Sequence, residues 1–528
     1  MNHTPAKDTS GGYAEPVALA ELAALAGGQL VSPGGASATL ASVSLDSETV
    51  RADGLFAALP GTRAHGASYA ADTTAAAILT DHDGWDLLKA AGETRPIVVV
   101  DDVREILGAV SARIYGYPSS RLTVLGVTGT SGKTTTTYLL EQGLIAAGHA
   151  VGLIGTTGTR IKGKQVPTSL TTPEAPTLHE LFARMEREGV THVVMEVSSH
   201  ALMLGRVNAT EFSVAGFTNL SQDHLDFHPT MEEYFEAKAT FFDPSSKAHG
   251  NASVVCVDDE WGTKLAARVS GATTVGTKGQ EQVEWAAELL DVSATGAQHI
   301  RLNHGAQSHE LRLPLPGAFN VANAALATAM AATVGTDIEA FVAGLENAAV
   351  PGRMERVEAG QEFVAVVDYA HKPAAVAAAL DTLRGQVEGR VGVVIGAGGD
   401  RDSSKRPLMG RAAAERADLV IVTDDNPRTE DPALIRSAVI AGADAAGTDA
   451  EIREVASRAD AISQLVAWAR PGDAVIAVGK GHEVGQIVGS TTHPFDDRAE
   501  MRRALRECGY REGVAKLGAD NQQPEGQP

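Results

Sequence analysis

The segment from Gly129 to Thr135 carries the residue types that a phosphate-binding loop requires. It reads Gly-Thr-Ser-Gly-Lys-Thr-Thr, follows an apolar, strand-like run and precedes a helical pattern. Gly129 and Gly132 allow a tight turn whose N–H groups face an anion at the start of the helix. Lys133 can reach the outer phosphates of a nucleoside triphosphate, and the Thr134 hydroxyl suits a Mg²⁺ ion. The residues predicted to meet the nucleotide here are Gly129, Thr130, Ser131, Gly132, Lys133, Thr134 and Thr135.

One position departs from the common phosphate-loop pattern G-x-x-x-x-G-K-[ST]. Its first glycine would stand at Val127, whereas the glycines of this chain are Gly126, Gly129 and Gly132. A glycine-rich turn without any ligand is the alternative. The strand-like run before the segment and the helical pattern after it favour a phosphate loop.

Two polar side chains should lie beside this loop. Glu196 and His224 come at the ends of two strand-like runs, His192–Val197 and Val214–Leu220, which we expect to flank the phosphate-loop strand. In a parallel sheet the C-terminal strand ends meet at one edge. A carboxylate and an imidazole at that edge suit Mg²⁺ binding or the orientation of phosphate charge. Alternatively, Glu196 caps a turn and His224 packs in the interior.

Two basic residues and two loops each have two interpretations. Lys238 lies in an amphipathic helical pattern, where a solvated surface lysine is the usual outcome. Arg206 could bind an anionic substrate or lie on the surface. The segments Ser44–Ser47 and Gly61–Gly66 could be ligand-binding loops or ordinary turns.

Polar residues near the C-terminus predict a pocket. Arg401, the segment Asp425–Arg428 and Glu483 all follow strand-like runs. The planar guanidinium of arginine binds a carboxylate through two parallel hydrogen bonds, and Glu483 can pair with an amine. The pocket would therefore take a molecule that bears both carboxylate and ammonium groups. A network of interdomain salt bridges is the alternative.

Strand-like and helical runs alternate along the chain, which predicts an α/β fold. We expect a small N-terminal α/β domain (15–121), a central domain with the phosphate loop on a parallel sheet (122–349) and a doubly wound, Rossmann-like C-terminal domain (350–515). Segments 1–14 and 516–528 are expected to be disordered tails. Helices are predicted at Val17–Ala26, Val103–Tyr115, Thr134–Ala147, Ala374–Arg384, Pro407–Ala417, Pro432–Gly442 and Ala461–Trp468.

Composition narrows the class of protein. A chain of 528 residues with 44% hydrophobic residues can bury several cores. The formal net charge of −22 disfavours nucleic-acid binding. The two cysteines, Cys256 and Cys508, indicate neither a disulfide framework nor a zinc cluster. No apolar run is long enough to span a bilayer, and the N-terminus lacks a signal core, so we expect a cytoplasmic monomer without membrane insertion.

Taken together, the motifs resemble those of the Mur ligases, the ATP-dependent amide-forming enzymes of peptidoglycan precursor synthesis. The resemblance covers nearly the whole chain outside the tails. It is carried by Gly129–Thr135, Thr171–Pro173, Met195–His200, Thr218–Asp226, Ala237–Lys238, Pro351–Arg356, Asp368–His371, Gly399–Asp402 and Gly479–Glu483.

The resemblance implies further roles. Lys238 would be carbamylated and would hold Mg²⁺ with Thr134, Glu196 and His224; Lys133, Glu196, His224 and Lys238 would be the catalytic residues. Asn320, Arg353 and His371 would also meet ATP. The residues implied for the UDP-linked substrate are Leu45, Ser47, Thr62, Arg63, Ala64, Thr171, Thr172, Ser198 and Arg206. Those implied for the amino acid are Arg401, Asp425, Asn426, Pro427, Arg428, Gly479 and Glu483.

The implied reaction adds meso-diaminopimelate to UDP-N-acetylmuramoyl-L-alanyl-D-glutamate through an acyl phosphate, with a hinge near Val350 and Pro351. Arg428 favours diaminopimelate, because that amino acid has a distal carboxylate that lysine lacks. The alternatives are the same ligase acting with lysine or another diamino acid, and a phosphate-loop NTPase that is not a ligase. Two positions depart from some relatives: Leu204 replaces a substrate-binding glutamine, and Leu170 replaces an asparagine.

Overall fold

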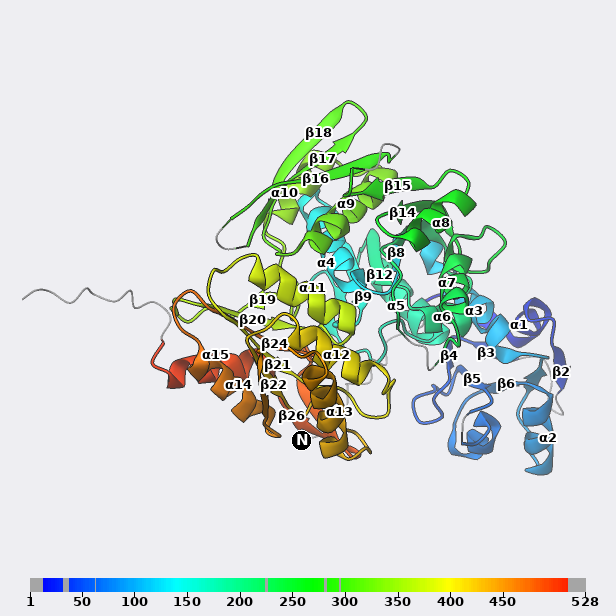
Figure 1. Ribbon diagram of the computed structural model, residues 1–528. Helices are drawn as coiled ribbons and strands as arrows, with labels where there is room; N and C mark the ends of the chain where they lie inside the picture. The colour runs from blue at the N-terminus through cyan, green and yellow to red at the C-terminus, as the bar shows by residue number, and fades with distance from the viewer. Residues whose placement is uncertain are drawn as a thin grey trace, which may run out of the picture.

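The computed structural model describes residues 13–31, 38–61, 63–223, 227–279, 283–293 and 296–510. Thr62, His224 and most of the two predicted tails lie outside the described residues. Three large sheets, each with helices, follow one another along the chain (Figure 1). This arrangement confirms the predicted α/β class, and Figure 1 shows the blue N-terminal part beside the cyan-to-green central part, with the yellow-to-red C-terminal part next to it.

The N-terminal sheet has five strands in the order β2-β7-β6-β5-β4, all parallel except β2. The predicted helix Val17–Ala26 is wrong at its start, because Val17 pairs with Leu40 in a short antiparallel bridge and the helix begins at Leu19. The strands are β1 (Val17–Ala18), β2 (Gln29–Val31), β3 (Thr39–Leu40), β4 (Ser42–Ser44), β5 (Gly54–Ala58), β6 (Ala77–Thr80) and β7 (Ile97–Val99). The helices are α1 (Leu19–Leu25), η1 (Gly66–Asp72), α2 (His82–Ala90), α3 (Val103–Ile114) and η2 (Pro118–Arg121).

The central sheet has eleven strands in the order β11-β10-β9-β12-β8-β13-β14-β15-β16-β17-β18. Its middle is parallel, as predicted, but β10, β11, β17 and β18 are antiparallel, so the prediction of a parallel sheet is wrong at both edges. Short turns such as the one at Gly305 connect these edge strands, and a short turn can only join antiparallel neighbours. The strands are β8 (Thr123–Thr128), β9 (Val151–Gly155), β10 (Gly158–Ile161), β11 (Lys164–Val166), β12 (His192–Glu196), β13 (Phe212–Phe217), β14 (Gly250–Cys256), β15 (Thr273–Gly276), β16 (Trp285–Val292), β17 (Gln298–His304) and β18 (Gln307–Leu313).

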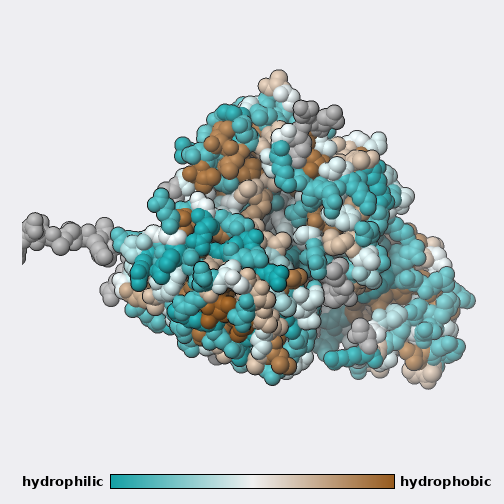
Figure 2. Space-filling view, viewed as in Figure 1, coloured by the Kyte–Doolittle hydropathy of each residue, from teal (hydrophilic) through white to brown (hydrophobic). Residues whose placement is uncertain are grey.

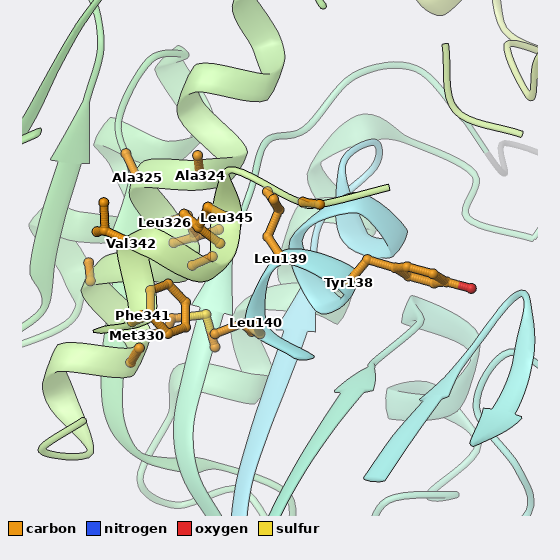
Figure 3. Packing of buried hydrophobic residues seen from close by; sticks show 14 of the residues in the cluster. Tyr138, Leu139, Leu140, Ala324, Ala325, Leu326, Met330, Phe341, Val342 and Leu345 are labelled. Atoms are coloured by element: carbon orange, nitrogen blue, oxygen red, sulfur yellow. The ribbon is translucent and has the colours of Figure 1, made fainter. Parts of the chain in front are cut away.

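Helices cover both faces of this sheet, and the strand side chains alternate between two cores. Leu125 and Val127 of β8 belong to the core formed with α4, α9 and α10, whereas Val124 belongs to the core formed with α5 and α7. Figure 3 shows the first of these cores, where side chains of α4, α9 and α10 converge. The helices are α4 (Lys133–Ala146), α5 (Ala175–Arg187), α6 (Ser199–Met203), α7 (Met231–Ala239), η3 (Thr240–Phe242), α8 (Glu260–Arg268), α9 (Ala318–Thr333) and α10 (Ile338–Leu345).

The C-terminal sheet has six strands in the order β19-β20-β24-β21-β22-β23, parallel except at β19. One core contains α11, α12 and α13 and the other contains α14 and α15, so the sheet is doubly wound, as predicted. The strands of this sheet are β19 (Glu355–Arg356), β20 (Val364–Asp368), β21 (Val391–Ile395), β22 (Leu419–Val422), β23 (Glu451–Glu454) and β24 (Ala474–Val478), while β25 (Gly485–Val488) and β26 (Thr491–Pro494) pair in a separate antiparallel sheet. The helices are α11 (Pro373–Arg384), α12 (Lys405–Ala414), α13 (Pro432–Asp444), α14 (Arg458–Trp468) and α15 (Asp497–Glu507).

The surface is mostly hydrophilic, and the two cysteines form no disulfide. Hydrophilic residues dominate the face in Figure 2, and apolar side chains gather there in small, separate patches. Cys256 is buried and Cys508 is exposed, and neither forms a disulfide. In the part of the chain that the structure describes, no helix has the length and apolar character needed to cross a membrane.

Candidate active site

The predicted phosphate loop lies between β8 and α4 with a backbone that only glycine adopts easily. Gly129 has a φ of 138° and Gly132 a φ of 89°. A Cβ atom at Gly129 would lie 1.9 Å from the Thr218 hydroxyl, so the loop and the end of β13 approach closely. Asn219 accepts a hydrogen bond from the Ser131 N–H (3.0 Å) and donates one to the Ser131 carbonyl (3.0 Å). The loop is therefore held in shape by the neighbouring strand end before any ligand binds.

Glu196 lies where the sequence placed it, at the end of β12 and next to β8. Its Oε1 accepts hydrogen bonds from the Thr134 hydroxyl (3.0 Å) and the Thr156 N–H (2.8 Å), and its Oε2 accepts one from the Thr156 hydroxyl (3.0 Å). The carboxylate thus contacts the phosphate-loop helix and also fastens the turn after β9. Both interpretations of Glu196, a capping residue and a cation ligand, fit these contacts.

Lys238 is not on the surface. It lies on α7 with 1% of its area exposed, and its Nζ donates a hydrogen bond to the carbonyl oxygen of Gly129 (2.9 Å). The default expectation of a solvated lysine is wrong because α7 packs on the central sheet directly beside the phosphate loop. Burial, and then the charges of Lys133 and Lys372, lower the pKa of Lys238 well below its usual value.

A third lysine, which the sequence analysis missed, enters the loop from the C-terminal part. Lys372 precedes α11, and its Nζ lies 3.2 Å from the carbonyl oxygen of Thr130 and 2.7 Å from Oδ2 of Asp223. Lys133 donates to the carbonyl oxygens of Gly129 (2.9 Å) and Thr130 (3.1 Å). Three ammonium groups therefore share two carbonyl oxygens, and burial followed by the charge of Lys372 lowers the pKa of Lys133 to about 8.

Arg353, predicted to meet ATP, also reaches the loop from the C-terminal part. Its Nη2 donates to the Thr134 hydroxyl (3.1 Å), and its guanidinium lies over the ring of Tyr369, 4.4 Å from the centroid. His371 follows, with Nδ1 2.9 Å from the carbonyl oxygen of Tyr369, and burial lowers its pKa well below the usual value. Asn320 lies at the start of α9, where it donates to the carbonyl oxygen of Pro316 (2.7 Å).

Four residues implied for the UDP-linked substrate lie together beside Glu196. Thr172 donates to the backbone carbonyl of Glu196 (2.8 Å), and Ser198 caps α6 by accepting the Ala201 N–H (3.2 Å). The Thr171 hydroxyl lies 3.1 Å from that of Thr156. Arg206 donates to the carbonyl oxygen of Thr172 (3.4 Å).

Arg206 already has an ion-pair partner. Its Nε lies 2.9 Å from Glu174, and Arg104 of α3 lies 3.3 Å from the other oxygen of the same carboxylate. Glu174 and Arg104 were not anticipated, and they join the N-terminal part to the central part. An anionic substrate would have to compete with Glu174 for Arg206.

The N-terminal residues implied for the same substrate lie on two loops. Leu45 and Ser47 follow β4, and the exposed Arg63 and Ala64 follow β5. No hydrogen bond or ion pair between described residues connects these loops to Thr171, Thr172, Ser198 or Arg206. The structure thus places the two loops at the C-terminal ends of neighbouring parallel strands without joining them to the Glu196 region.

The predicted pocket near the C-terminus contains a compact polar cluster. Asn426 donates to Glu483 (2.9 Å) and accepts a hydrogen bond from Lys480 (2.8 Å). Lys480 also lies 3.7 Å from both Asp425 and Glu483. Burial, then the charge of Asp425, raises the pKa of Glu483. Gly479 is required here, since a Cβ atom would lie 2.5 Å from Oδ2 of Asp425.

Arg428 lies beside that cluster, and its charge acts to lower the pKa of Glu483 against the larger effect of burial. Its Nη1 donates to the carbonyl oxygen of Gly399 (2.7 Å), and its backbone, with a φ of 51°, exchanges hydrogen bonds with Ile487 and Gly489. Within the described ranges, neither Arg428 nor Arg401 forms an ion pair, and Arg401 is exposed. The ion pairs of Lys480 with Asp425 and Glu483 lie within the C-terminal part, so they are not the interdomain network that was the alternative interpretation.

His482, next to Glu483 in the chain, contacts Tyr369 and the turn after β9. Its ring lies 5.1 Å from that of Tyr369, and it interacts with the backbone of Thr156, which holds Glu196. Burial, followed by the charge of Arg353, lowers the pKa of His482 to about 4. Lys480 and His482 lie inside the motif Gly479–Glu483, and Lys372 directly follows the motif Asp368–His371; these positions were the signal available for finding them.

The central and C-terminal parts of the chain meet at the phosphate loop, through Arg353 and Lys372. Among the described residues no three His, Cys, Asp or Glu side chains cluster as a ready metal site. The oxygen donors at the loop are the Thr134 hydroxyl and the Glu196 carboxylate, which suit a hard cation such as Mg²⁺ if further ligands are supplied.

Comparisons with known proteins agree with this geometry. Residues 127–331 match the Mur ligase middle domain, and residues 352–481 match the Mur ligase glutamate ligase domain. The chain belongs to the Mur ligase family.

Its relatives narrow the class further. The chain is 61% identical over 477 residues to the UDP-N-acetylmuramoyl-L-alanyl-D-glutamate–2,6-diaminopimelate ligase of Corynebacterium glutamicum, covering 89% of this chain and 92% of that protein. It is 45% identical over 496 residues to the ligase of the same name from Streptomyces coelicolor, covering 93% and 96%. A solved structure of a ligase of that name aligns with a TM-score of 0.65 and 31% identity, covering 94% of this chain and 100% of that one.

Proposed function

We propose that this protein is an ATP-dependent ligase that joins meso-diaminopimelate to UDP-N-acetylmuramoyl-L-alanyl-D-glutamate in peptidoglycan precursor synthesis. The observation that carries the proposal is the convergence on one phosphate loop of Glu196 from the central sheet and of Arg353 and Lys372 from the C-terminal part. The names of the 61% and 45% identical relatives, which print UDP-N-acetylmuramoyl-L-alanyl-D-glutamate and 2,6-diaminopimelate, support the choice of these two substrates.

The first step is the attack of the D-glutamyl carboxylate on the γ-phosphorus of ATP. A P–O bond forms, the bond to ADP breaks, and an acyl phosphate results. Two anions must approach each other, and Lys133 lowers the repulsion between them. Thr172, Ser198 and Arg206 lie beside Glu196, where they can orient the UDP-linked substrate toward the loop.

The second step forms the amide. The amine of diaminopimelate attacks the acyl carbon, a tetrahedral intermediate forms, and phosphate leaves as the nitrogen loses its proton. Asn426 and Glu483 would bind an ammonium group and Arg428 a carboxylate; the hydrogen bond between Asn426 and Glu483 and the lack of an ion pair at Arg428 among the described residues support these roles. Lysine lacks the distal carboxylate and would leave Arg428 unpaired, which is the basis for selecting diaminopimelate.

Mg²⁺ would be held by Thr134, Glu196, His224 and a carbamate on Lys238. When bound, the ion supplies positive charge that offsets the charge of the phosphates. The surroundings of Lys238 support the carbamate: the lysine is buried beside two other lysines, and a negative carbamate would relieve their mutual repulsion.

We place the domain boundaries at 15–121, 122–349 and 350–515, with a hinge near Val350 and Pro351. The first boundary precedes β8, and the second lies between α10 and β19. We also propose that the protein acts as a cytoplasmic monomer, since one chain supplies every residue assigned to the site.

An incorporation assay tests the function. The chain is incubated with ATP, the UDP-linked dipeptide and radiolabelled meso-diaminopimelate, L-lysine or L-ornithine, and the UDP-linked product is counted. We expect incorporation of diaminopimelate alone, with ATP hydrolysis dependent on both other substrates. Hydrolysis that neither substrate affects would instead support a phosphate-loop NTPase, and incorporation of lysine would support the other ligase.

A further inference from the structure

Lys372 is a buried cation that the C-terminal part places inside the phosphate loop of the central part. It lies between β20 and α11, and 7% of its area is exposed. Its Nζ contacts the carbonyl oxygen of Thr130 at 3.2 Å and Oδ2 of Asp223 at 2.7 Å. A long side chain from one sheet thus ends among the backbone groups that shape the nucleotide site of another.

Its electrostatic surroundings are unfavourable without a ligand. Lys133 and Lys238 donate to the same short stretch of loop, and the charge of Lys372 lowers the pKa of both. Burial lowers the pKa of Lys372 itself, and Asp223 opposes that shift. Two carboxylates, Asp223 and Glu196, act on these lysines, and they do not balance three ammonium groups and the guanidinium of Arg353. An anion with several negative charges in the loop would relieve this repulsion.

We propose that Lys372 is a phosphate-binding residue that the C-terminal part supplies for the γ-phosphate of the bound nucleotide. Its ammonium group exchanges the Thr130 carbonyl for γ-phosphate oxygens, while Asp223 continues to hold the side chain in place. The inference rests on the proposed function in assigning ATP as the substrate.

This role would link nucleotide state to closure of the C-terminal part. ADP lacks the phosphate that Lys372 would contact, so the contact across the two parts would be strongest with ATP or the acyl phosphate and weaker after phosphate leaves. The competing possibility is that Lys372 merely joins the two parts through Asp223, with no contact to the nucleotide.

The test separates these possibilities by comparing two nucleotides. Lys372→Gln retains a donor for Thr130 and Asp223 but removes the charge, and Lys372→Arg retains the charge. Binding of a non-hydrolysable ATP analogue and of ADP to the full chain, with Mg²⁺, is measured by calorimetry. We expect Lys372→Gln to weaken the triphosphate about 10- to 100-fold, as for the loss of one charged hydrogen bond, and ADP by less than about threefold.

Lys372→Arg should preserve the preference for the triphosphate to within about tenfold of the unchanged chain. Equal losses for both nucleotides in Lys372→Gln, or no loss for either, would overturn the inference. If thermal unfolding shows that Lys372→Gln does not fold, binding to Lys372→Arg is the test. Loss of the preference for the triphosphate over ADP in Lys372→Arg would also overturn the inference.

A matched control lies at the other interface. Lys247 forms a 2.7 Å ion pair with Glu105 between the central and N-terminal parts, far out on the surface, and Lys247→Ala should bind both nucleotides as the unchanged chain does. The binding experiment contains no amino acid or UDP-linked substrate. A chain that binds the triphosphate through Lys372 but forms no tripeptide product would refute the proposed ligase and leave this inference standing.

Discussion

The phosphate loop and the C-terminal pocket differ in how their charged side chains are paired. At the loop, Lys133, Lys238 and Lys372 crowd together with few anions nearby. In the pocket, Lys480 already lies near two carboxylates, Asp425 and Glu483. A polyanion entering the loop therefore relieves repulsion, whereas a zwitterion entering the pocket must displace or share existing partners.

The phosphate loop and the pocket also differ in the elements that hold them in place. The loop begins α4, and Gly143 of that helix packs so tightly on Phe341 of α10 that a Cβ atom would lie 2.4 Å from the ring (Figure 3 shows this core). The pocket is formed by loops, and Arg428 holds a backbone conformation uncommon for a residue with a side chain. The comparison suggests a rigid nucleotide site and a pocket that depends on loop conformation for its selectivity.

The largest effect should come from removing a buried lysine at the loop. Lys238→Ala should lower the rate of tripeptide formation about 1,000-fold if Lys238 carries the proposed carbamate, because the substitution would remove that ligand of Mg²⁺. The measurement is product formation at saturating substrates, repeated with added short carboxylates, which should restore part of the rate. Lys264→Ala changes an exposed lysine on α8 and should behave as the unchanged chain. Full activity in Lys238→Ala would show that Lys238 has no role in catalysis at the phosphate loop.

A smaller and more selective effect should follow from a change in the pocket. Arg428→Ala should raise the KM for diaminopimelate about 10- to 100-fold and leave the KM for ATP unchanged, because only a carboxylate contact is lost. Steady-state kinetics with each substrate varied in turn checks this. Arg453→Ala is the control, since Arg453 pairs with Glu451 on β23, away from the pocket. An unchanged KM together with continued exclusion of lysine would contradict the assigned specificity.

The two regions should respond to pH in opposite directions. The pKa of Lys133 is lowered to about 8, so its positive charge is present below that pH and is lost above it. Affinity for the triphosphate should then fall by up to about tenfold per pH unit in that range. The raised pKa of Glu483 means that its negative charge is lost on acidification sooner than for an ordinary glutamate, which should weaken diaminopimelate binding on the acidic side.

Calorimetric titrations of each ligand across the pH range distinguish the two trends. Lys133→Arg should flatten the alkaline loss because the guanidinium stays charged. If the affinities for both ligands changed with pH in the same way, Lys133 and Glu483 would not control binding at the two sites as expected.

The smallest effect on activity should come from the support of the loop. Gly143→Ala should lower the free energy of unfolding by about 1–3 kcal/mol, because the methyl group has no space beside Phe341. Urea unfolding checks the stability, and nucleotide binding of the folded fraction should change little. Gly148→Ala is a useful comparison, as nothing lies within 4 Å of its Cβ position and only its φ of 88° opposes the change. A Gly143→Ala protein that is as stable as the unchanged chain would show that the contact is not tight.

Local pattern was sufficient for much of the fold. Continuous apolar runs predicted the buried strands around β8 and β24, because a strand covered on both faces has no polar side to alternate with. The phosphate loop was predictable from a few adjacent residues, since its function depends on backbone geometry that glycine permits. The antiparallel edges of the central sheet were not predicted, because direction depends on which strands become neighbours.

The burial of Lys238 and Lys372 could not be predicted from local sequence pattern. A lysine in an amphipathic helix is usually solvated. Lys238 lies in a motif and Lys372 directly follows one, but neither motif shows that these two lysines are buried while Lys264 is exposed. Their burial depends on α7 packing beside β8 and on the loop before α11 reaching Thr130, contacts between residues 109 and 242 positions apart. The same holds for Glu174, whose bond to Arg104 joins two parts of the chain.

The sequence by itself determined the class of fold, the phosphate loop and the set of motifs typical of a Mur ligase, since each depends on residues that are neighbours along the chain. Only the tertiary structure decided which charges meet: it gathered three lysines at two carbonyl oxygens and left Arg428 without an ion pair among the described residues. Electrostatic interactions act through space, so their balance is fixed only when distant segments have packed together.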